Sequence, residues 1–215
     1  PFSFYLSKAL ESMRETTLSI AAGGDTQPLL QAQFEKMSLD HGLVRVCLFE
    51  ELLGLSSRPS VSDGNPVEGW LLHHRRPDPV IKSTQDKELY GSLGELEIEK
   101  EDWVILDPKD NDIRETATSN LIFASGEELV IPEKWVLNGI VLQKLLPFLE
   151  KRFAVTRAIP KDQDISSFDE IILCGTGRGV APLTVLSELG WRSQGNSVFS
   201  EIRTHYEELL RSSSA

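Results

Sequence analysis

The sequence predicts a mixed α+β protein in two parts, the second of which is rich in strands. Three observations lead to this prediction: short β-branched runs typical of strands, apolar residues at helical spacing near both ends of the chain, and a proline-containing stretch near residue 80. The 215 residues can form one large domain or two small ones. We therefore expect a small α/β domain over residues 1–80 and a large strand-rich domain over residues 81–215.

The first domain is expected to combine helices with strands. Apolar residues recur near helical spacing in two stretches, and Gly23-Gly24 separates them. The expected elements are helices over 4–22 and 27–39, strands over 44–49 and 67–73, and a loop over 56–66. The chain opens at Pro1 without an initiating Met, so we expect this domain to lack its natural start.

The second domain is expected to place Lys82 before an alternation of strands and helices. Turn residues separate the strand-like runs, and amphipathic patterns mark the longer helices. The expected elements are a short helix over 85–93, strands over 103–106, 113–123, 129–131, 153–159 and 170–174, and helices over 139–151 and 197–211. Pro147 is a candidate kink in the first of the two longer helices.

The charge of the chain limits its partners. It has 33 acidic and 22 basic residues, a formal net charge of -11. Nucleic acids and anionic membranes attract basic surfaces, so neither is an expected partner, and no apolar run approaches the length of a membrane span. We expect a cytoplasmic protein, or an organellar one if a transit peptide has been removed.

The cysteines and histidines do not indicate a disulfide or a metal site. Cys47 and Cys174 lie in apolar runs, which is typical of buried, reduced cysteines. The four histidines lack the spacing of metal ligands. A metal is therefore not an expected cofactor.

Three segments carry residues that could perform chemistry, and the first is Ile81-Lys82-Ser83-Thr84. It places a lysine between an apolar residue and two hydroxyl residues. An amine that forms an imine must be available unprotonated, which burial and neighbouring positive charge favour. Taken alone, this segment favours an ordinary solvated surface lysine.

The second segment, residues 114–123, places Glu115 at the head of a predicted strand. Small polar residues follow before the strand becomes apolar. A glutamate beside a pyridine nitrogen keeps that nitrogen protonated, and a protonated ring accepts electrons from a substrate carbanion. The alternative is a hairpin residue on a solvated face.

The third feature is a pair of candidate anion-binding segments. Residues 138–141 open a predicted helix, whose free N–H groups and positive dipole end favour a phosphate. Gly175-Thr176-Gly177 follows a predicted strand and lets the backbone approach a ligand closely. Glycines in such places also simply turn the chain, so each segment alone is compatible with a structural role.

The order and spacing of these segments resemble the fold-type IV pyridoxal-phosphate (PLP) enzymes, which include class IV aminotransferases and aminodeoxychorismate lyases. Lys82 and Glu115 are 33 positions apart (115 − 82), which is similar to the separation in the lyases. Residues 115–123 are similar to the family's pattern of a glutamate, small residues, an asparagine and an apolar residue before Phe. Residues 137–141 resemble its first phosphate-binding turn, and residues 174–183 resemble its second.

The resemblance implies a two-domain fold of the D-amino acid aminotransferase type, with its N-terminal part incomplete, and pyridoxal 5'-phosphate as the cofactor. It implies that Lys82 holds PLP as a Schiff base and moves the substrate proton. It also implies that Glu115 pairs with the pyridine nitrogen and that Asn120 braces the strand that carries Glu115.

The resemblance assigns the cofactor phosphate to three residues near the two glycine turns. The backbone N–H groups of Ile140 and Val141 would bind it, together with the backbone and hydroxyl of Thr176. Arg178 is a weaker candidate, which would either meet a substrate carboxylate or serve the structure.

The resemblance leaves three functions open. The first is a 4-amino-4-deoxychorismate lyase of folate biosynthesis, which gives p-aminobenzoate and pyruvate. The second is a class IV aminotransferase acting on branched-chain or D-amino acids. The third is a non-catalytic family member, because Ser12 stands where the family has a phosphate-binding arginine. We rank the lyase first, and the relatives imply a homodimer that acts on a small amino-acid-like substrate.

Overall fold

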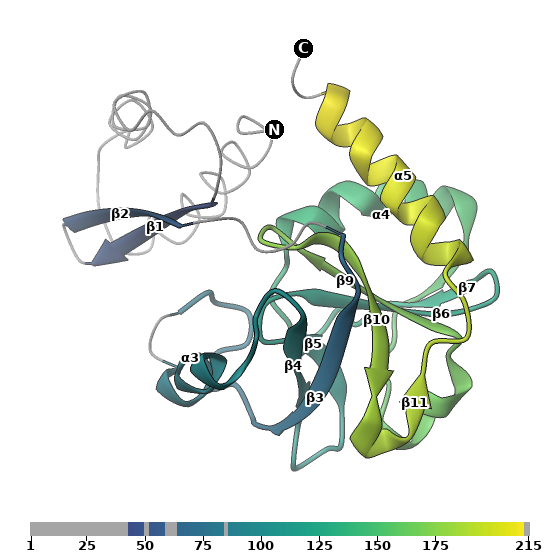
Figure 1. Ribbon diagram of the computed structural model, residues 1–215, viewed down its shortest axis with the longest axis horizontal. Coiled ribbons are helices and arrows are strands. Elements are labelled where there is room, and N and C mark those ends of the chain that lie inside the picture. Colours follow the sequence, from purple (N-terminus) through teal and green to yellow (C-terminus); the bar gives the residue numbers. More distant parts are fainter. Residues whose placement is uncertain (1–42, 50–51, 59–63, 84–85, 213–215) are drawn as a thin grey trace. The chain divides into compact units, whose positions relative to one another are not determined.

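The computed structural model describes residues 43–49, 52–58, 64–83 and 86–212 (Figure 1). These residues fall into two compact units. One contains the antiparallel hairpin of β1 (Leu43–Phe49) and β2 (Leu52–Arg58), and the other contains residues 64–209. The helices predicted over 4–22 and 27–39 lie outside the described residues.

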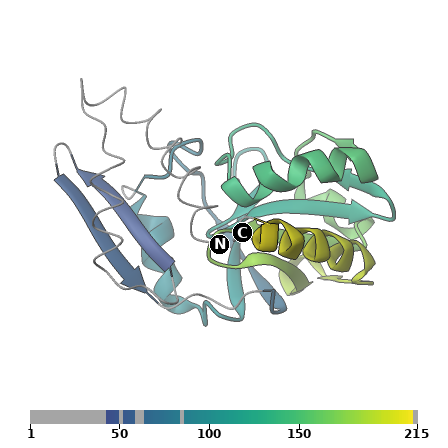
Figure 2. The same ribbon diagram turned by 90° about the horizontal axis from the view of Figure 1, so that it is seen from above.

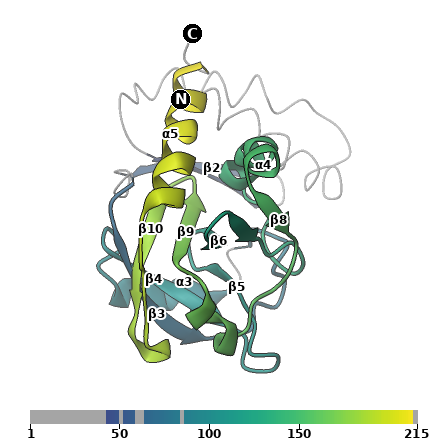
Figure 3. The same cartoon turned by 90° about the vertical axis from the view of Figure 1, so that its right-hand side faces the viewer.

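The larger unit is built around a closed barrel. Its strands are β3 (Val67–His73), β4 (Glu101–Leu106), β5 (Ile113–Thr116), β6 (Asn120–Ser125), β9 (Glu170–Gly175) and β10 (Gly179–Leu186). The strands β3 to β6 pair in sequence order, β6 then pairs with β9, and β9 pairs with β10. The ring closes because β10 also pairs with β3, in parallel, and it can be followed in Figure 3.

Shorter elements surround the barrel. The remaining strands are β7 (Glu128–Val130), β8 (Ala154–Thr156) and β11 (Trp191–Arg192), and the α-helices are α3 (Lys87–Ser92), α4 (Ile140–Arg152) and α5 (Ser197–Ser212). Three short 3-10 helices are η1 (Leu93–Glu95), η2 (Asp162–Ser167) and η3 (Ser187–Leu189). The helix η2 follows the strand β8, and η3 follows the barrel strand β10.

Apolar side chains from all the barrel strands form one buried cluster. Alternate residues of a strand face opposite sides of a sheet, so every second residue can face inward. The buried members are Val67, Val104, Leu106, Ile113, Leu121, Phe123, Ile165, Phe168, Ile171, Leu173, Ala181, Leu183, Leu186 and Trp191. Burying a large apolar side chain of this kind contributes about 1.5–3 kcal/mol relative to exposure, so the cluster contributes substantially to the stability of this unit.

The helices α4 and α5 lie side by side (Figure 2). The rings of Phe148 on α4 and His205 on α5 stack with their centroids 4.1 Å apart. The buried carboxylate of Glu170, at the start of β9, accepts hydrogen bonds from the backbone N–H groups of Val198 (3.0 Å) and Phe199 (2.8 Å). A negative charge at a helix N-terminus is favourable, so Glu170 anchors α5 to the barrel.

The structure divides the strand predicted over 113–123 into β5 and β6. The chain turns at residues 117–119, where Thr116 Oγ1 accepts a hydrogen bond from the backbone N–H of Ser119 at 2.9 Å. The Thr116 N–H in turn donates to the Ser119 carbonyl at 2.8 Å. Hydroxyl side chains stabilise tight turns in this way, whereas the same small residues in sequence are also compatible with a strand.

The boundary between the two units also differs from the one expected at residue 80. β3 pairs with both β4 and β10, so it is an integral strand of the barrel rather than part of the first unit. Three further strands, β2, β10 and β11, were not predicted. β2 overlaps the loop expected over 56–66, and β10 begins within residues 174–183, the stretch that resembles the second phosphate-binding turn of the family. These strands lack the long β-branched runs that identify strands in a single sequence.

The other predicted elements lie within a few residues of the observed ones. Pro147 lies inside α4, which continues from Ile140 to Arg152. In the part of the chain that the structure describes, no helix is both long and apolar enough to cross a membrane. The predicted cellular compartment stays a prediction.

Candidate active site

Glu115 and Asn120 lie opposite each other on β5 and β6. They form a register pair of these antiparallel strands, so their side chains project from the same face. Both residues are buried, with 6% of each exposed. The turn at residues 117–119 therefore brings a carboxylate and an amide together in a position shielded from water.

Both side chains contact the backbone of Leu137. The Leu137 N–H donates to Glu115 Oε2 at 3.4 Å, and Asn120 Nδ2 donates to the Leu137 carbonyl at 2.7 Å. A Cβ on Gly139 would lie 1.9 Å from Asn120 Oδ1. A side chain cannot occupy that space, so glycine allows the chain to enter α4 directly against Asn120.

The second glycine segment contacts the same turn from β9. A Cβ on Gly175 would lie 2.7 Å from Ser119 Oγ and 2.8 Å from the Thr118 carbonyl oxygen. Thr176, the next residue, is exposed in the turn that leads to β10. The two predicted anion-binding segments thus both pack against one short piece of chain, residues 118–120.

Ile140 and Val141 are the first two residues of α4. The preceding Gly139 is extended, and no side chain caps the helix. The first N–H groups of a helix have no partner within the helix, and the helix dipole makes this end attractive to an anion. The start of α4 can therefore hold a phosphate through its backbone.

Lys82 lies on the loop between β3 and α3, and the residue is exposed. Hydrogen bonds shape this loop on both sides of it: Ile81 N donates to the Asp78 carbonyl at 3.1 Å, and Ser83 N donates to the Ile81 carbonyl at 3.0 Å. The positive charge of Lys82 lowers the pKa of Glu115. The two residues are therefore close enough to interact electrostatically.

The charge of Glu115 is set by opposing influences. Burial raises the pKa of Glu115 above the ordinary glutamate value of 4.5. Arg76 is the strongest influence in the other direction, and its Nη1 donates to Glu115 Oε1 at 2.5 Å. Burial is the larger of these influences, so the pKa of Glu115 is raised overall, and loss of Arg76 would raise it further.

Arg178 makes internal contacts, which correspond to the structural role that was one of the two considered from the sequence. Only 1% of the residue is exposed, and its Nε lies 3.2 Å from Asp102 Oδ2, whose residue is 0% exposed. Its Nη2 donates to the Glu101 carbonyl at 2.5 Å. The guanidinium thus ties the turn between β9 and β10 to β4, while its buried Nη1 has no hydrogen-bond partner among the described residues.

Sequence reasoning did not identify Arg76. It is the second residue of the pair Arg75-Arg76, and nothing in the sequence distinguishes the two. In the structure the Arg75 side chain is 49% exposed, whereas the Arg76 side chain is 10% exposed and paired with Glu115. Burial, which a single sequence does not reveal for such a pair, is the property that separates them.

Comparison with known proteins places the chain among PLP enzymes. Residues 56–186 match a family model described as Amino-transferase class IV. A protein from Legionella pneumophila, provisionally assigned as a 4-amino-4-deoxychorismate lyase, is 15% identical with a TM-score of 0.76, and the match covers 95% of this chain and 85% of that chain. No curated protein sequence matches the chain.

Two further solved structures share the fold. A protein from Thermotoga maritima, provisionally assigned as a branched-chain amino acid aminotransferase, is 18% identical with a TM-score of 0.73, covering 95% of this chain and 79% of that chain. An aminotransferase from Brucella abortus bound to the cofactor PLP is 24% identical with a TM-score of 0.58, covering 73% of this chain and 58% of that chain. At these identities the likeness shows the fold, and it confirms the predicted fold class.

Replacing Gly139 by Ala is expected to destabilise the protein by about 1–3 kcal/mol, the usual cost of adding a methyl group where space is filled. The φ of Gly139 is −71°, which alanine adopts freely, so the cost comes from the contact with Asn120. Urea denaturation measures the change. Gly91→Ala is the control, because a Cβ at Gly91 in α3 meets nothing within 4 Å. Equal stability of the two variants would contradict the close packing of Asn120 on Gly139.

Proposed function

The chain belongs to the class IV aminotransferase family, and we propose that it is a 4-amino-4-deoxychorismate lyase that holds PLP at Lys82, Glu115 and the start of α4. Members of this family are PLP-dependent enzymes, so membership confirms the predicted class of enzyme and its cofactor. The proposal adds the reaction and the residues. It rests on one observation: Glu115 and Asn120 contact the chain at the entry to α4, and Lys82 lies within electrostatic reach of Glu115.

The residues present fit the chemical groups of PLP. The uncapped start of α4 offers the backbone N–H groups of Ile140 and Val141 to a phosphate, and the exposed Thr176 offers a hydroxyl. Glu115 offers a buried carboxylate to a ring nitrogen. Lys82 offers a primary amine to an aldehyde, with which it would form a Schiff base.

The proposed roles of the side chains follow from their charges. When bound, PLP supplies an electron-accepting ring that stabilises negative charge at the substrate Cα. The Glu115 carboxylate favours the protonated, positively charged form of the ring nitrogen. The Lys82 amine would remove the proton from the amine-bearing carbon of the substrate. In the lyase reaction the ring C–O bond to the enolpyruvyl group breaks, and the proton passes to the released enolpyruvate, which becomes pyruvate. Asn120 holds the Leu137 backbone and thereby the path of the chain into α4.

The lyase is proposed as the reaction because of the spacing between the two charged residues. The separation of 33 positions between Lys82 and Glu115 is similar to that of aminodeoxychorismate lyases. In that reaction 4-amino-4-deoxychorismate gives p-aminobenzoate and pyruvate, without a second substrate. The alternative is an aminotransferase acting on branched-chain or D-amino acids, which the family match and the likeness to the Thermotoga maritima protein favour.

Reduction with borohydride in the presence of PLP is expected to attach a pyridoxyl group to Lys82. Peptide mapping by mass spectrometry locates the adduct. Lys82→Ala should lose it, whereas Lys87→Ala, which removes an exposed lysine of α3, should retain it on Lys82. A folded protein whose Lys82 stays unmodified would overturn the proposed cofactor site.

Pyruvate is expected to form from 4-amino-4-deoxychorismate without any added 2-oxo acid. A coupled lactate dehydrogenase assay measures it, with Lys82→Ala as the inactive control. An absolute requirement for 2-oxoglutarate, with amino-group transfer to it, would replace the lyase by the aminotransferase.

We further propose that the protein acts as a homodimer, as the resemblance to its family implies. Size-exclusion chromatography with light scattering is expected to give twice the mass of the 24.0 kDa chain. A monomer across micromolar concentrations would refute the dimer without affecting the proposed reaction.

A further inference from the structure

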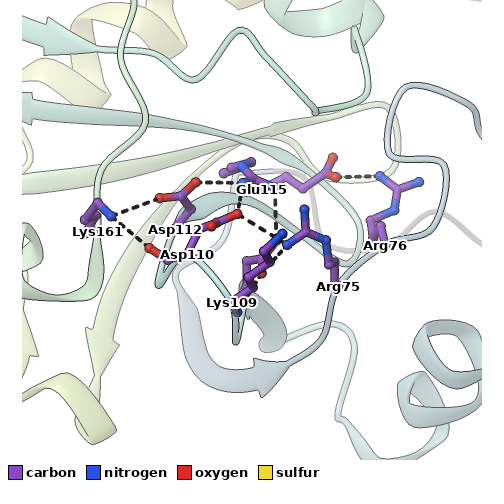
Figure 4. Close-up of polar contacts among 9 residues, drawn as sticks. Arg75, Arg76, Lys109, Asp110, Asp112, Glu115 and Lys161 are labelled. Atoms are coloured by element: carbon purple, nitrogen blue, oxygen red, sulfur yellow. Dashed lines mark hydrogen bonds and ion pairs between the residues drawn. The ribbon is translucent and has the colours of Figure 1, made fainter.

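One arginine with a largely shielded side chain joins the two charged residues of the proposed site. Arg76 Nη1 donates to Glu115 Oε1 at 2.5 Å and to the Pro79 carbonyl at 3.2 Å, while Nη2 donates to the Ile81 carbonyl at 3.2 Å. Ile81 directly precedes Lys82. A single guanidinium therefore contacts both the carboxylate and the backbone that carries the lysine, and Figure 4 shows it directed at Glu115.

We propose that Arg76 is a positioning residue that fixes the loop of Lys82 against Glu115 and reserves one oxygen of that carboxylate for PLP. This inference rests on the proposed roles of Lys82 and Glu115 and adds a residue to them. Arg76 contacts Oε1, whereas Oε2 accepts the long 3.4 Å hydrogen bond from Leu137 N and no other among the residues that the structure describes. A carboxylate oxygen accepts more than one hydrogen bond, so Oε2 retains the capacity to bind a ring N–H.

A second buried contact closes the same loop at its base. His74 Nε2, just after β3, lies 2.9 Å from Asp86 Oδ2, and each residue is 7% exposed. Asp86 Oδ1 also accepts a hydrogen bond from Leu89 N at the start of α3, at 3.2 Å. The two ends of the loop are thus held together, and Arg76 donates two hydrogen bonds within it, to the carbonyls of Pro79 and Ile81. The third hydrogen bond of the Arg76 guanidinium, to Glu115, connects this loop to β5.

The charge of Arg76 matters as much as its geometry. Burial raises the pKa of Glu115, and Arg76 is the largest influence that lowers it. Without Arg76 the carboxyl would take up a proton at a higher pH than it does now. A protonated Glu115 no longer favours a charged pyridine ring, so cofactor binding would weaken and would recover as the pH rises.

The neighbouring Arg75 provides a matched control. It has the same charge, but its Nη1 contacts Asp107 Oδ1 and Asp110 Oδ2, each at 3.3 Å, instead of Glu115. In Figure 4 the two arginine side chains are directed at different carboxylates. Removing Arg75 changes the net charge by the same amount as removing Arg76 and leaves the Glu115 contact in place.

The test compares Arg76→Gln, Arg76→Lys and Arg75→Gln with the wild-type chain in two measurements. The first is the dissociation constant for PLP by equilibrium dialysis, across neutral and alkaline pH. The second is hydrogen exchange of the peptide covering residues 77–83 in the cofactor-free protein, which does not depend on PLP. Arg76→Lys keeps the charge and loses the planar group that reaches both carbonyls.

We expect Arg76→Gln to weaken PLP binding at neutral pH about tenfold or more, since hydrogen bonds to charged groups contribute about 1.5–3 kcal/mol. The loss should shrink as the pH rises, and exchange in residues 77–83 should accelerate. Arg76→Lys should restore the pH profile but not the slow exchange. Arg75→Gln should stay within about twofold of wild type in affinity, because the exposed Arg75 side chain pairs with Asp107 and Asp110 and not with Glu115.

The outcomes separate this inference from the proposed function. If the wild-type chain binds PLP and Arg76→Gln matches Arg75→Gln in both measurements, the role of Arg76 is wrong. If the wild-type chain does not bind PLP, the proposed function fails, and the exchange of residues 77–83 still decides whether Arg76 fixes the loop. If Arg76→Gln does not fold, Arg76→Lys decides: slow exchange equal to wild type would overturn the proposal.

Discussion

The tight turn between β5 and β6 determines where the other parts of the site lie. Its residues 117–119 bring Glu115 and Asn120 into register, and the side chain of Asn120 occupies the space beside Gly139. Gly175 packs against the same turn. The start of α4 and the end of β9 are distant in sequence. Both can pack against residues 118–120 because Gly139 and Gly175 have no side chain in the way. Any widening of the turn would separate the carboxylate from the start of α4.

One buried ion pair and one partly buried ion pair hold the chain near this turn. Arg178 pairs with Asp102, which also accepts hydrogen bonds from the hydroxyls of Thr116 and Thr118 within the turn region. Arg76 pairs with Glu115 at the start of the same hairpin. Burial raises the pKa of both Asp102 and Glu115, which shows that each charge is costly in place. Buried pairs contribute little net stability, but removing one partner leaves an uncompensated charge, so they favour this one arrangement over looser ones.

The sequence predicts the elements of the larger unit far better than the roles of its arginines. Strands β3, β4 and β9 and helices α4 and α5 carry local patterns of alternating or helical apolar residues, and they appear where expected. The turn after Thr116 was missed because small hydroxyl residues suit a strand and a turn equally. The two roles considered for Arg178 could not be separated from the sequence, and Arg76 was overlooked, for a different reason. Their partners lie 76 and 39 positions away in the sequence, so only the folded chain reveals the pairing.

The balance of charge around the site bears on how a phosphate would be held. The chain has a formal net charge of -11, which disfavours an anion at long range. The two arginines nearest the turn do not offset this, because each is already paired with a carboxylate. Among the described residues, the groups that match a phosphate are instead the neutral backbone N–H groups at the start of α4 and the hydroxyl of Thr176. Such donors act at short range and depend on position, so the contacts that place α4 against Asn120 matter more to anion binding than the overall charge does.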